Sequence, residues 1–297
     1  MKRRMGNWRA GPSVLGILVL TGAVGLGVTG ISTSVSGAAS AKKITGIPNY
    51  RNTLAGNTKG WCPITAPANL PCDGAPGDYG TIHVLKSTFT NYGGYASAVP
   101  GPNGVKKYAR VSGGQDGGVP TVNGCSVPGN EDFSGPYTKF GSTVHHAIFP
   151  AGGFTTSIQL YIDASWAGAH PGNVVDWDVA LRDNTGAFLE DNAFNLCSTS
   201  NAGGGFYAST SFGAGGCSTG PTELSVSGWY TFNLTFTSAG GQVVDTNSVL
   251  NSAASPVFSD TVPTGNATTG VGGPDYGWLP NEDVLGLPVS HVSLSLL

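Results

Sequence analysis

Hydrophobic and polar residues alternate along several stretches of this chain. Period-two alternation is clearest in the ranges 154–163, 175–183 and 229–237, where apolar side chains gather on one face. Further candidate strands are 187–196, 242–250, 257–262 and 289–296, with weaker examples at 81–89 and 143–149. Successive side chains of a β-strand point to opposite faces, so an alternation of period two indicates half-buried strands. Beyond residue 41 no stretch sustains a helical period. The pattern therefore predicts a chain built almost entirely of β-strands.

The segments between these strands contain turn-forming residues. Residues 183–186 read Asp-Asn-Thr-Gly and residues 239–241 read Ala-Gly-Gly, both typical of tight turns. Strands with one apolar and one polar face are typical of antiparallel sheets that bury one side. We therefore predict an all-β fold, a two-sheet antiparallel β-sandwich of the jelly-roll or concanavalin-like type, over residues 79–297. Residues 42–78, rich in Pro, Asn and Gly, are predicted to form a lead-in arm.

The first 41 residues have the parts of an export signal. A basic start is followed by an apolar run at 14–28 and by Ala-Ser-Ala at 39–41, as in a secretory signal peptide. The apolar run is shorter than the roughly 20 residues that span a bilayer, although an uncleaved anchor remains the alternative. We expect a secreted, extracellular protein whose only membrane contact would be an uncleaved signal segment.

Charge narrows the set of partners. Only 10% of the 297 residues are charged, against roughly 25% in ordinary soluble domains. The formal net charge is −3, and the chain is more acidic beyond residue 41 because four basic residues and no acidic ones precede that point. A charge-poor, weakly acidic surface does not attract phosphate backbones, so we expect no nucleic-acid partner.

The five cysteines predict disulfides, because exported proteins mature in oxidising surroundings. Local pairing is the simplest arrangement, with Cys62 bonded to Cys72 and Cys197 bonded to Cys217. Cys125 is then left over, either as a small buried hydrophobic residue or as a reactive thiol. No Cys-x-x-Cys pair and no His-Glu-x-x-His motif occurs, so no metal site of the zinc type is predicted.

Two further kinds of site are compatible with the residues. Asp176 and Asp178 share one face of a predicted strand at about 6.5–7 Å, a spacing that could place two carboxyls across a sugar. The alternative is that both are solvated residues of an ordinary strand. No cofactor is required, but the oxygen-rich loops at 72–78 and 274–283 would suit a structural calcium ion.

Aromatic residues in polar surroundings give the clearest indication of a binding role. Trp166 lies in a stretch rich in Gly and Ala, while Tyr276 and Trp278 follow Asp275 in the sequence Pro-Asp-Tyr-Gly-Trp. An aromatic ring beside Asp or Asn can stack on a sugar while the polar groups bind its hydroxyls. The alternative is that these rings cap the open ends of the sandwich core.

The stretches Gly228-Trp229-Tyr230-Thr231-Phe232, Asp176-Trp177-Asp178-Val179 and Tyr276-Gly277-Trp278 together resemble exported bacterial β-sandwich proteins of concanavalin-like or jelly-roll type. The resemblance spans roughly residues 80–297 and departs from the glucanases of that group, because no Glu-x-Asp-x-x-Glu strand is present. The export signal, low charge, polar sheet faces and loop aromatics favour a secreted or surface-associated, non-catalytic protein that binds polysaccharide or cell-envelope glycan. A carbohydrate-active hydrolase or lyase and an extracellular coat protein remain as alternatives.

Overall fold

The computed structural model describes residues 47, 49–62, 80–87, 99–113, 136–140, 148–169, 174–198, 205–212, 222–279 and 287–297. Contacts divide the chain into residues 1–42 and residues 43–297, and the fold described below belongs to the second unit. The predicted signal peptide falls outside the described residues. Among the residues that are described, no helix has both the length and the apolar character to cross a membrane.

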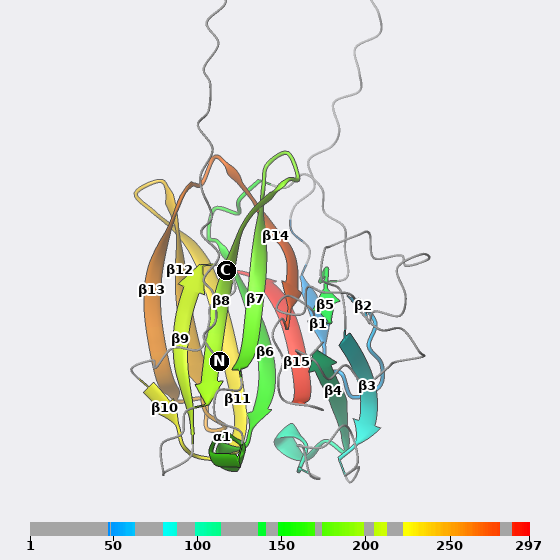
Figure 1. The fold of residues 1–297 in the computed structure, drawn as a ribbon. Coiled ribbons are helices and arrows are strands. Elements are labelled where there is room, and N and C mark those ends of the chain that lie inside the picture. The colour runs from blue at the N-terminus through cyan, green and yellow to red at the C-terminus, as the bar shows by residue number, and fades with distance from the viewer. Residues whose placement is uncertain are drawn as a thin grey trace, which may run out of the picture. The chain divides into compact units, whose positions relative to one another are not determined.

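The described residues form two antiparallel sheets (Figure 1). The larger one, sheet A, has the strand order β13-β12-β11-β6-β15-β4-β3, and β1 also pairs with β15. Its strands are β1 (Tyr50–Asn52), β3 (Gly80–Lys86), β4 (Lys107–Gly113), β6 (Phe154–Ile162), β11 (Gly228–Ala239), β12 (Gln242–Leu250), β13 (Pro256–Ala267) and β15 (Leu287–Leu296).

Sheet B has seven strands in the order β10-β9-β8-β7-β14-β5-β2. They are β2 (Trp61–Cys62), β5 (Tyr137–Thr138), β7 (Val174–Asp183), β8 (Phe188–Ser198), β9 (Phe206–Phe212), β10 (Thr222–Leu224) and β14 (Val271–Trp278). Two short helices complete the described elements, the 3₁₀ turn η1 (Pro102–Gly104) and α1 (Ala164–Ala169).

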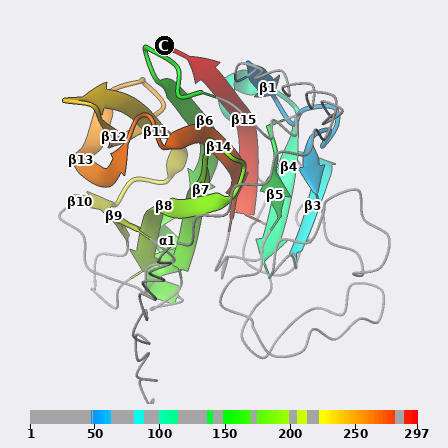
Figure 2. The same ribbon diagram turned by 90° about the horizontal axis from the view of Figure 1, so that it is seen from above.

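The two sheets lie one over the other as the layers of a sandwich, with β7 and β8 in front of β6 and β11 (Figures 1 and 2). Alternate residues of β6 are buried, and so are Val175, Trp177, Val179 and Leu181 on the facing side of β7. The ring of Phe194 in β8 lies 5.5 Å from that of Phe232 in β11 and 6.2 Å from that of Phe258 in β13. The predicted two-sheet antiparallel β-sandwich is therefore confirmed.

Strands with strict alternation were located well from sequence. The ranges 154–163, 229–237 and 242–250 correspond to β6, β11 and β12. Both tight turns are also present. Gly186 and the pair Gly240 and Gly241 have positive φ values, which glycine adopts without strain. At the first turn the Asp183 carboxylate accepts hydrogen bonds from the amides of Thr185 and Ala187 at 2.8 and 2.9 Å.

Other elements differ from the sequence prediction. Residues 271–278, expected as a polar loop, form β14, and residues 164–169 form a helix that begins where Asp163 accepts a hydrogen bond from the Ser165 amide. Part of the expected arm also belongs to the sheets, because β1 and β2 pair with β15 and β5. The expected strand at 143–149 lies largely outside the described residues.

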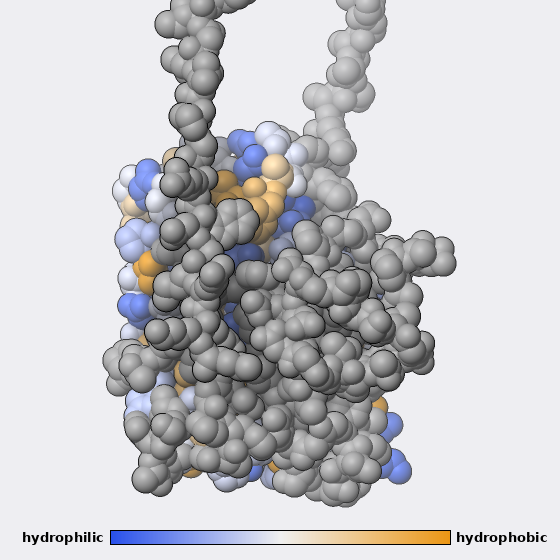
Figure 3. Space-filling view, viewed as in Figure 1, coloured by the Kyte–Doolittle hydropathy of each residue, from blue (hydrophilic) through white to orange (hydrophobic). Residues whose placement is uncertain are grey.

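Large exposed hydrophobic residues are scattered over separate elements of the described part. They are Ile148, Phe188, Val226, Leu296 and Leu297. Figure 3, viewed as in Figure 1, shows hydrophilic and hydrophobic residues interspersed on the part of the surface drawn in colour. Scattered single residues of this kind are normal on soluble proteins and do not by themselves mark an interface.

Candidate functional site

The face of sheet B turned away from sheet A, called here the outer face, holds the two aspartates singled out in the sequence. Asp176 and Asp178 alternate with the core residues of β7, and their register partners on β8 are Asn195 and Ala193. Asp176 and Asp178 are 0% exposed and Asn195 is 1% exposed. The expectation of a solvated polar face is therefore wrong for β7, which is buried on both sides as the middle strand of the sheet.

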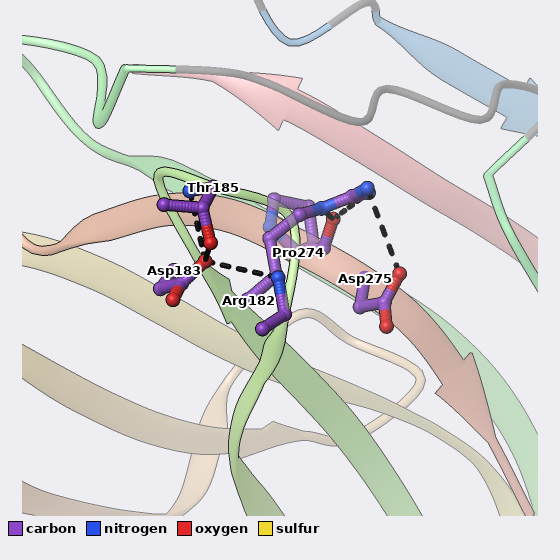
Figure 4. A network of polar contacts seen from close by, with 6 residues as sticks. Arg182, Asp183, Thr185, Pro274 and Asp275 are labelled. Atoms are coloured by element: carbon purple, nitrogen blue, oxygen red, sulfur yellow. Dashed lines mark hydrogen bonds and ion pairs between the residues drawn. The ribbon is translucent and has the colours of Figure 1, made fainter.

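A bulge in β14 brings Asp275 and Tyr276 to this face. Pro274 is opposite Leu181 and Tyr276 is opposite Ala180, so Asp275 is an extra residue without a register partner. An inserted residue breaks the strict alternation of a strand and redirects its side chains. Asp275 consequently reaches Arg182 of β7, with 3.6 Å between its Oδ1 and the Arg182 Nη1 (Figure 4).

Arg182 fixes the geometry of this bulge. Its Nε and Nη2 donate hydrogen bonds to the Pro274 carbonyl at 3.1 and 2.6 Å, and the residue is 4% exposed. Burial lowers the pKa of Arg182, and the charge of Asp275 opposes that shift. The guanidinium therefore holds both the Pro274 backbone and the Asp275 carboxylate (Figure 4).

Three aromatic rings line the other side of the bulge. The Tyr276 ring lies 5.9 Å from the ring of Tyr137 in β5 and 5.9 Å from that of Trp278, and both contacts are edge-to-face. Tyr137 and Trp278 are buried, whereas Tyr276 is only half-buried. Tyr276 is therefore the most solvent-exposed of the three rings.

Two carboxyls of the outer face, those of Asp178 and Asp191, hold protons more tightly than ordinary ones. Burial raises the pKa of Asp178 well above its usual value, and the charges of Asp176 and Asp191 add to the shift. Burial also raises the pKa of Asp191 to about 6, with a contribution from Asp275. Perturbed carboxyls of this kind gather at functional sites. We call the half-buried group Asp191, Asp275 and Tyr276, together with Arg182, the β14 patch.

The structure places the remaining predicted site residues elsewhere. Trp166 lies in α1, is 6% exposed and belongs to the hydrophobic core, where its ring lies 6.2 Å from that of Tyr161 in sheet A. Asp275, expected in a calcium-binding loop, is instead the partner of Arg182.

Several predicted residues fall outside the described part of the chain. Among them are Cys72, Cys125 and Cys217, so the pairs Cys62–Cys72 and Cys197–Cys217 stay predictions. Residues 72–78 and 280–283 of the expected calcium-binding loops are outside it as well.

Sequence reasoning overlooked three members of the outer face. These are Asp191, Arg182 and Asn195. The signal was present, because Asp191 and Asn195 occupy alternate positions of one strand and can share a face with Asp176 and Asp178 once β7 and β8 pair. The bulge, which depends on tertiary packing, left no such signal.

Fold and site together define an antiparallel β-sandwich with an aromatic and acidic patch on the outer face of one sheet. Neither the models of known protein families nor the sequences of curated proteins match this chain. Two solved structures are distantly similar. One is the CBM2 module of the evolved Dit of Lactobacillus casei BL23 phage J-1, with 13% identity over 84% of this chain and 97% of that one, at a TM-score of 0.35. The other is the CBM40 of the Ruminococcus gnavus IT-sialidase bound to α2,6-sialyllactose, with 9% identity over 53% and 82% of the chains, at a TM-score of 0.26. These similarities are too distant to support an argument about this chain.

Proposed function

We propose that this protein is a secreted, glycan-binding β-sandwich and that the β14 patch is its binding site. The observation that carries the proposal is the pairing of a half-buried ring with an anchored carboxylate. Tyr276 is held between two buried rings, and Asp275 beside it is fixed by Arg182. A rigid ring next to fixed polar groups is the combination that recognises the apolar face and the hydroxyls of a sugar.

The carboxyls of the patch supply acceptors for sugar hydroxyls, from Asp191 and Asp275. The Arg182 guanidinium is only 4% exposed and holds the Asp275 carboxylate in place. Because Arg182 is tied to the Pro274 carbonyl, little side-chain freedom remains to be lost when a ligand binds. Neutral or weakly polar glycans are the best match, since the patch combines acidic and basic groups.

The test is a glycan-array screen with the purified chain, followed by calorimetry on the best ligand. Tyr276→Ala should weaken binding at least about tenfold, because it removes the stacking ring. Tyr276→Phe is the matched control and should bind within about twofold of the parent, because it keeps the ring. Silence across plant, fungal and bacterial glycans, or equal loss in both variants, would refute the proposal.

Hydrolysis is a second candidate, favoured by the paired carboxyls of β7. Asp176 and Asp178 lie two residues apart on one face, and the raised pKa of Asp178 suits a general acid at neutral pH. Catalysis would then require substrate to reach the buried Asp178. An assay on the glycans found by the array separates the two functions, because Asp178→Asn should abolish turnover while leaving binding unchanged.

A further inference from the structure

A second group of polar residues lies inside the sandwich, between the two sheets. Glu190 and Asn192 occupy inward positions of β8, on the same side as the buried Phe194. Asp245 and Asn247 occupy inward positions of β12, between the buried Val243 and Val249 in the alternation. Asn192, Asp245 and Asn247 are only 1%, 1% and 2% exposed. Each sheet thus contributes one acid and one amide to an otherwise apolar layer.

These four residues form one cluster across the gap between the sheets. The Nδ2 of Asn247 donates a hydrogen bond to the Oδ2 of Asp245 at 3.1 Å. The charge of Glu190 acts on the Asp245 carboxyl, and Asn192 interacts with the Glu190 carboxyl. We call Glu190, Asn192, Asp245 and Asn247 the inter-sheet cluster.

The rim of the inter-sheet cluster is also polar. Thr210 of β9 donates a hydrogen bond to the Oδ2 of Asp260 in β13 at 2.7 Å, which joins the two sheets at that edge. The charge of Asp260 acts on Asp245 in turn. The cluster therefore lies close to an exposed edge of the sandwich, because Asp260 is an exposed residue.

Each member of the inter-sheet cluster has a buried oxygen without a hydrogen-bond partner. These atoms are Glu190 Oε1, Asn192 Oδ1, Asp245 Oδ1 and Asn247 Oδ1. A buried acceptor without a partner is costly, and a buried carboxylate beside a half-buried one, with no counter-charge, is more so. Among the described groups that act on Glu190 and Asp245 there is no Lys, Arg or His. Burial raises the pKa of Asp245 to about 8 and also raises the pKa of Glu190, so both carboxyls disfavour their charged forms here. One cation would stabilise both carboxylates and satisfy the four free acceptors together.

We propose that the inter-sheet cluster binds a calcium ion between the two sheets. Calcium takes six to eight oxygen ligands at about 2.3–2.6 Å in flexible geometry, and carboxylate and amide oxygens are among its usual ligands. Stacked sheets are about 10 Å apart, which leaves room for an ion with oxygens on both sides. Magnesium fits less well because it requires a regular octahedron.

The donor set is a mixed one. No group of three or more His, Cys, Asp or Glu side chains within the described residues is arranged to hold a metal, so the amides and water must complete the coordination of the two carboxylates.

This site is independent of the proposed glycan function. Glu190 and Asn192 point into the sandwich, whereas Asp191 between them belongs to the outer face.

The test uses the purified chain, stripped with a chelator and titrated with calcium chloride. Calorimetry should show one ion per chain, and calcium at about 100 times its Kd should raise the Tm by about 5–10 °C. Glu190→Gln and Asp245→Asn should each weaken calcium binding at least about tenfold, since affinity follows ligand charge. Glu223→Gln in β10 is the matched control, because Glu223 is exposed and apart from the cluster, and it should bind calcium like the parent.

The variants remain informative about folding. Both replace a carboxylate by an amide of nearly the same shape, so in chelator they should be at least as stable as the parent. Loss of calcium binding in a folded variant therefore reports on the site itself. The proposal is overturned if the parent chain shows neither heat nor a Tm shift with calcium, or if the two cluster variants bind calcium as tightly as the Glu223→Gln control.

Discussion

Asp178 shows how strongly a single side chain can couple this fold to pH. Both of its carboxyl oxygens are buried without a hydrogen-bond partner, and its pKa is raised by burial and by neighbouring aspartates. The folded state therefore keeps a proton on Asp178 that the unfolded state releases near pH 3.9. Where the unfolded state binds fewer protons, stability falls as pH rises.

We expect the free energy of unfolding to decline from about pH 4 upwards, until the folded-state pKa of Asp178 is passed. Asp178→Asn removes this titration, so the variant should lose less stability between pH 4 and pH 7 than the parent. Urea unfolding at a series of pH values measures the difference. Parallel profiles for the two proteins would contradict the assignment.

Arg182 should stabilise the folded protein, because it binds the Pro274 carbonyl and the Asp275 carboxylate. Replacing it by methionine leaves the Pro274 carbonyl and the Asp275 carboxylate without their partner, which should cost about 1–3 kcal/mol. Arg51 is exposed on β1, so Arg51→Met serves as the control and should be nearly neutral. The denaturation midpoint in urea distinguishes them, and an unchanged midpoint for Arg182→Met would show that the bulge does not depend on this side chain.

At the scale of elements, the site depends on β14, a strand that its sequence does not reveal. β6 and β11 were predictable because apolar residues recur at nearly every second position of each strand. β14 reads Val-Gly-Gly-Pro-Asp-Tyr-Gly-Trp, which has low strand propensity. Its pairing with β7 contains two register shifts, so no regular alternation exists to be found. For the same reason the sequence predicts a loop at Asp275 and Tyr276, where the structure has a bulged strand.

Gly277 lies where the strand packs too closely against aromatic rings to accommodate a larger side chain. A Cβ there would lie 2.5 Å from the Trp177 ring and 2.7 Å from that of Phe140. Gly277→Ala should therefore destabilise the protein by about 1–3 kcal/mol through overpacking. Gly228→Ala in β11 is the matched control, since its Cβ would meet nothing within 4 Å, and it should be neutral or slightly stabilising. Thermal melts of both variants test the contrast, which fails if they melt together.

At the scale of the whole molecule, the two sheets share one core. Phe232 of sheet A contacts Phe194 of sheet B, so removing its ring affects both layers. Phe232→Ala should cost about 3–5 kcal/mol. Far-ultraviolet dichroism and tryptophan fluorescence should then report the same lowered transition. Two separate transitions would mean that the sheets unfold independently.

The order in which the strands meet also constrains how this molecule is made. β15 lies in the interior of sheet A and pairs with β6, β4 and β1, whose residues are far earlier in the chain. While the ribosome is still producing the segment before residue 287, none of these three strands has the neighbour it requires. Sheet A can close only after synthesis has passed β15, and loop closure over such sequence separations is slow. An incomplete chain exposes open strand edges, which makes it prone to aggregation until β15 is added.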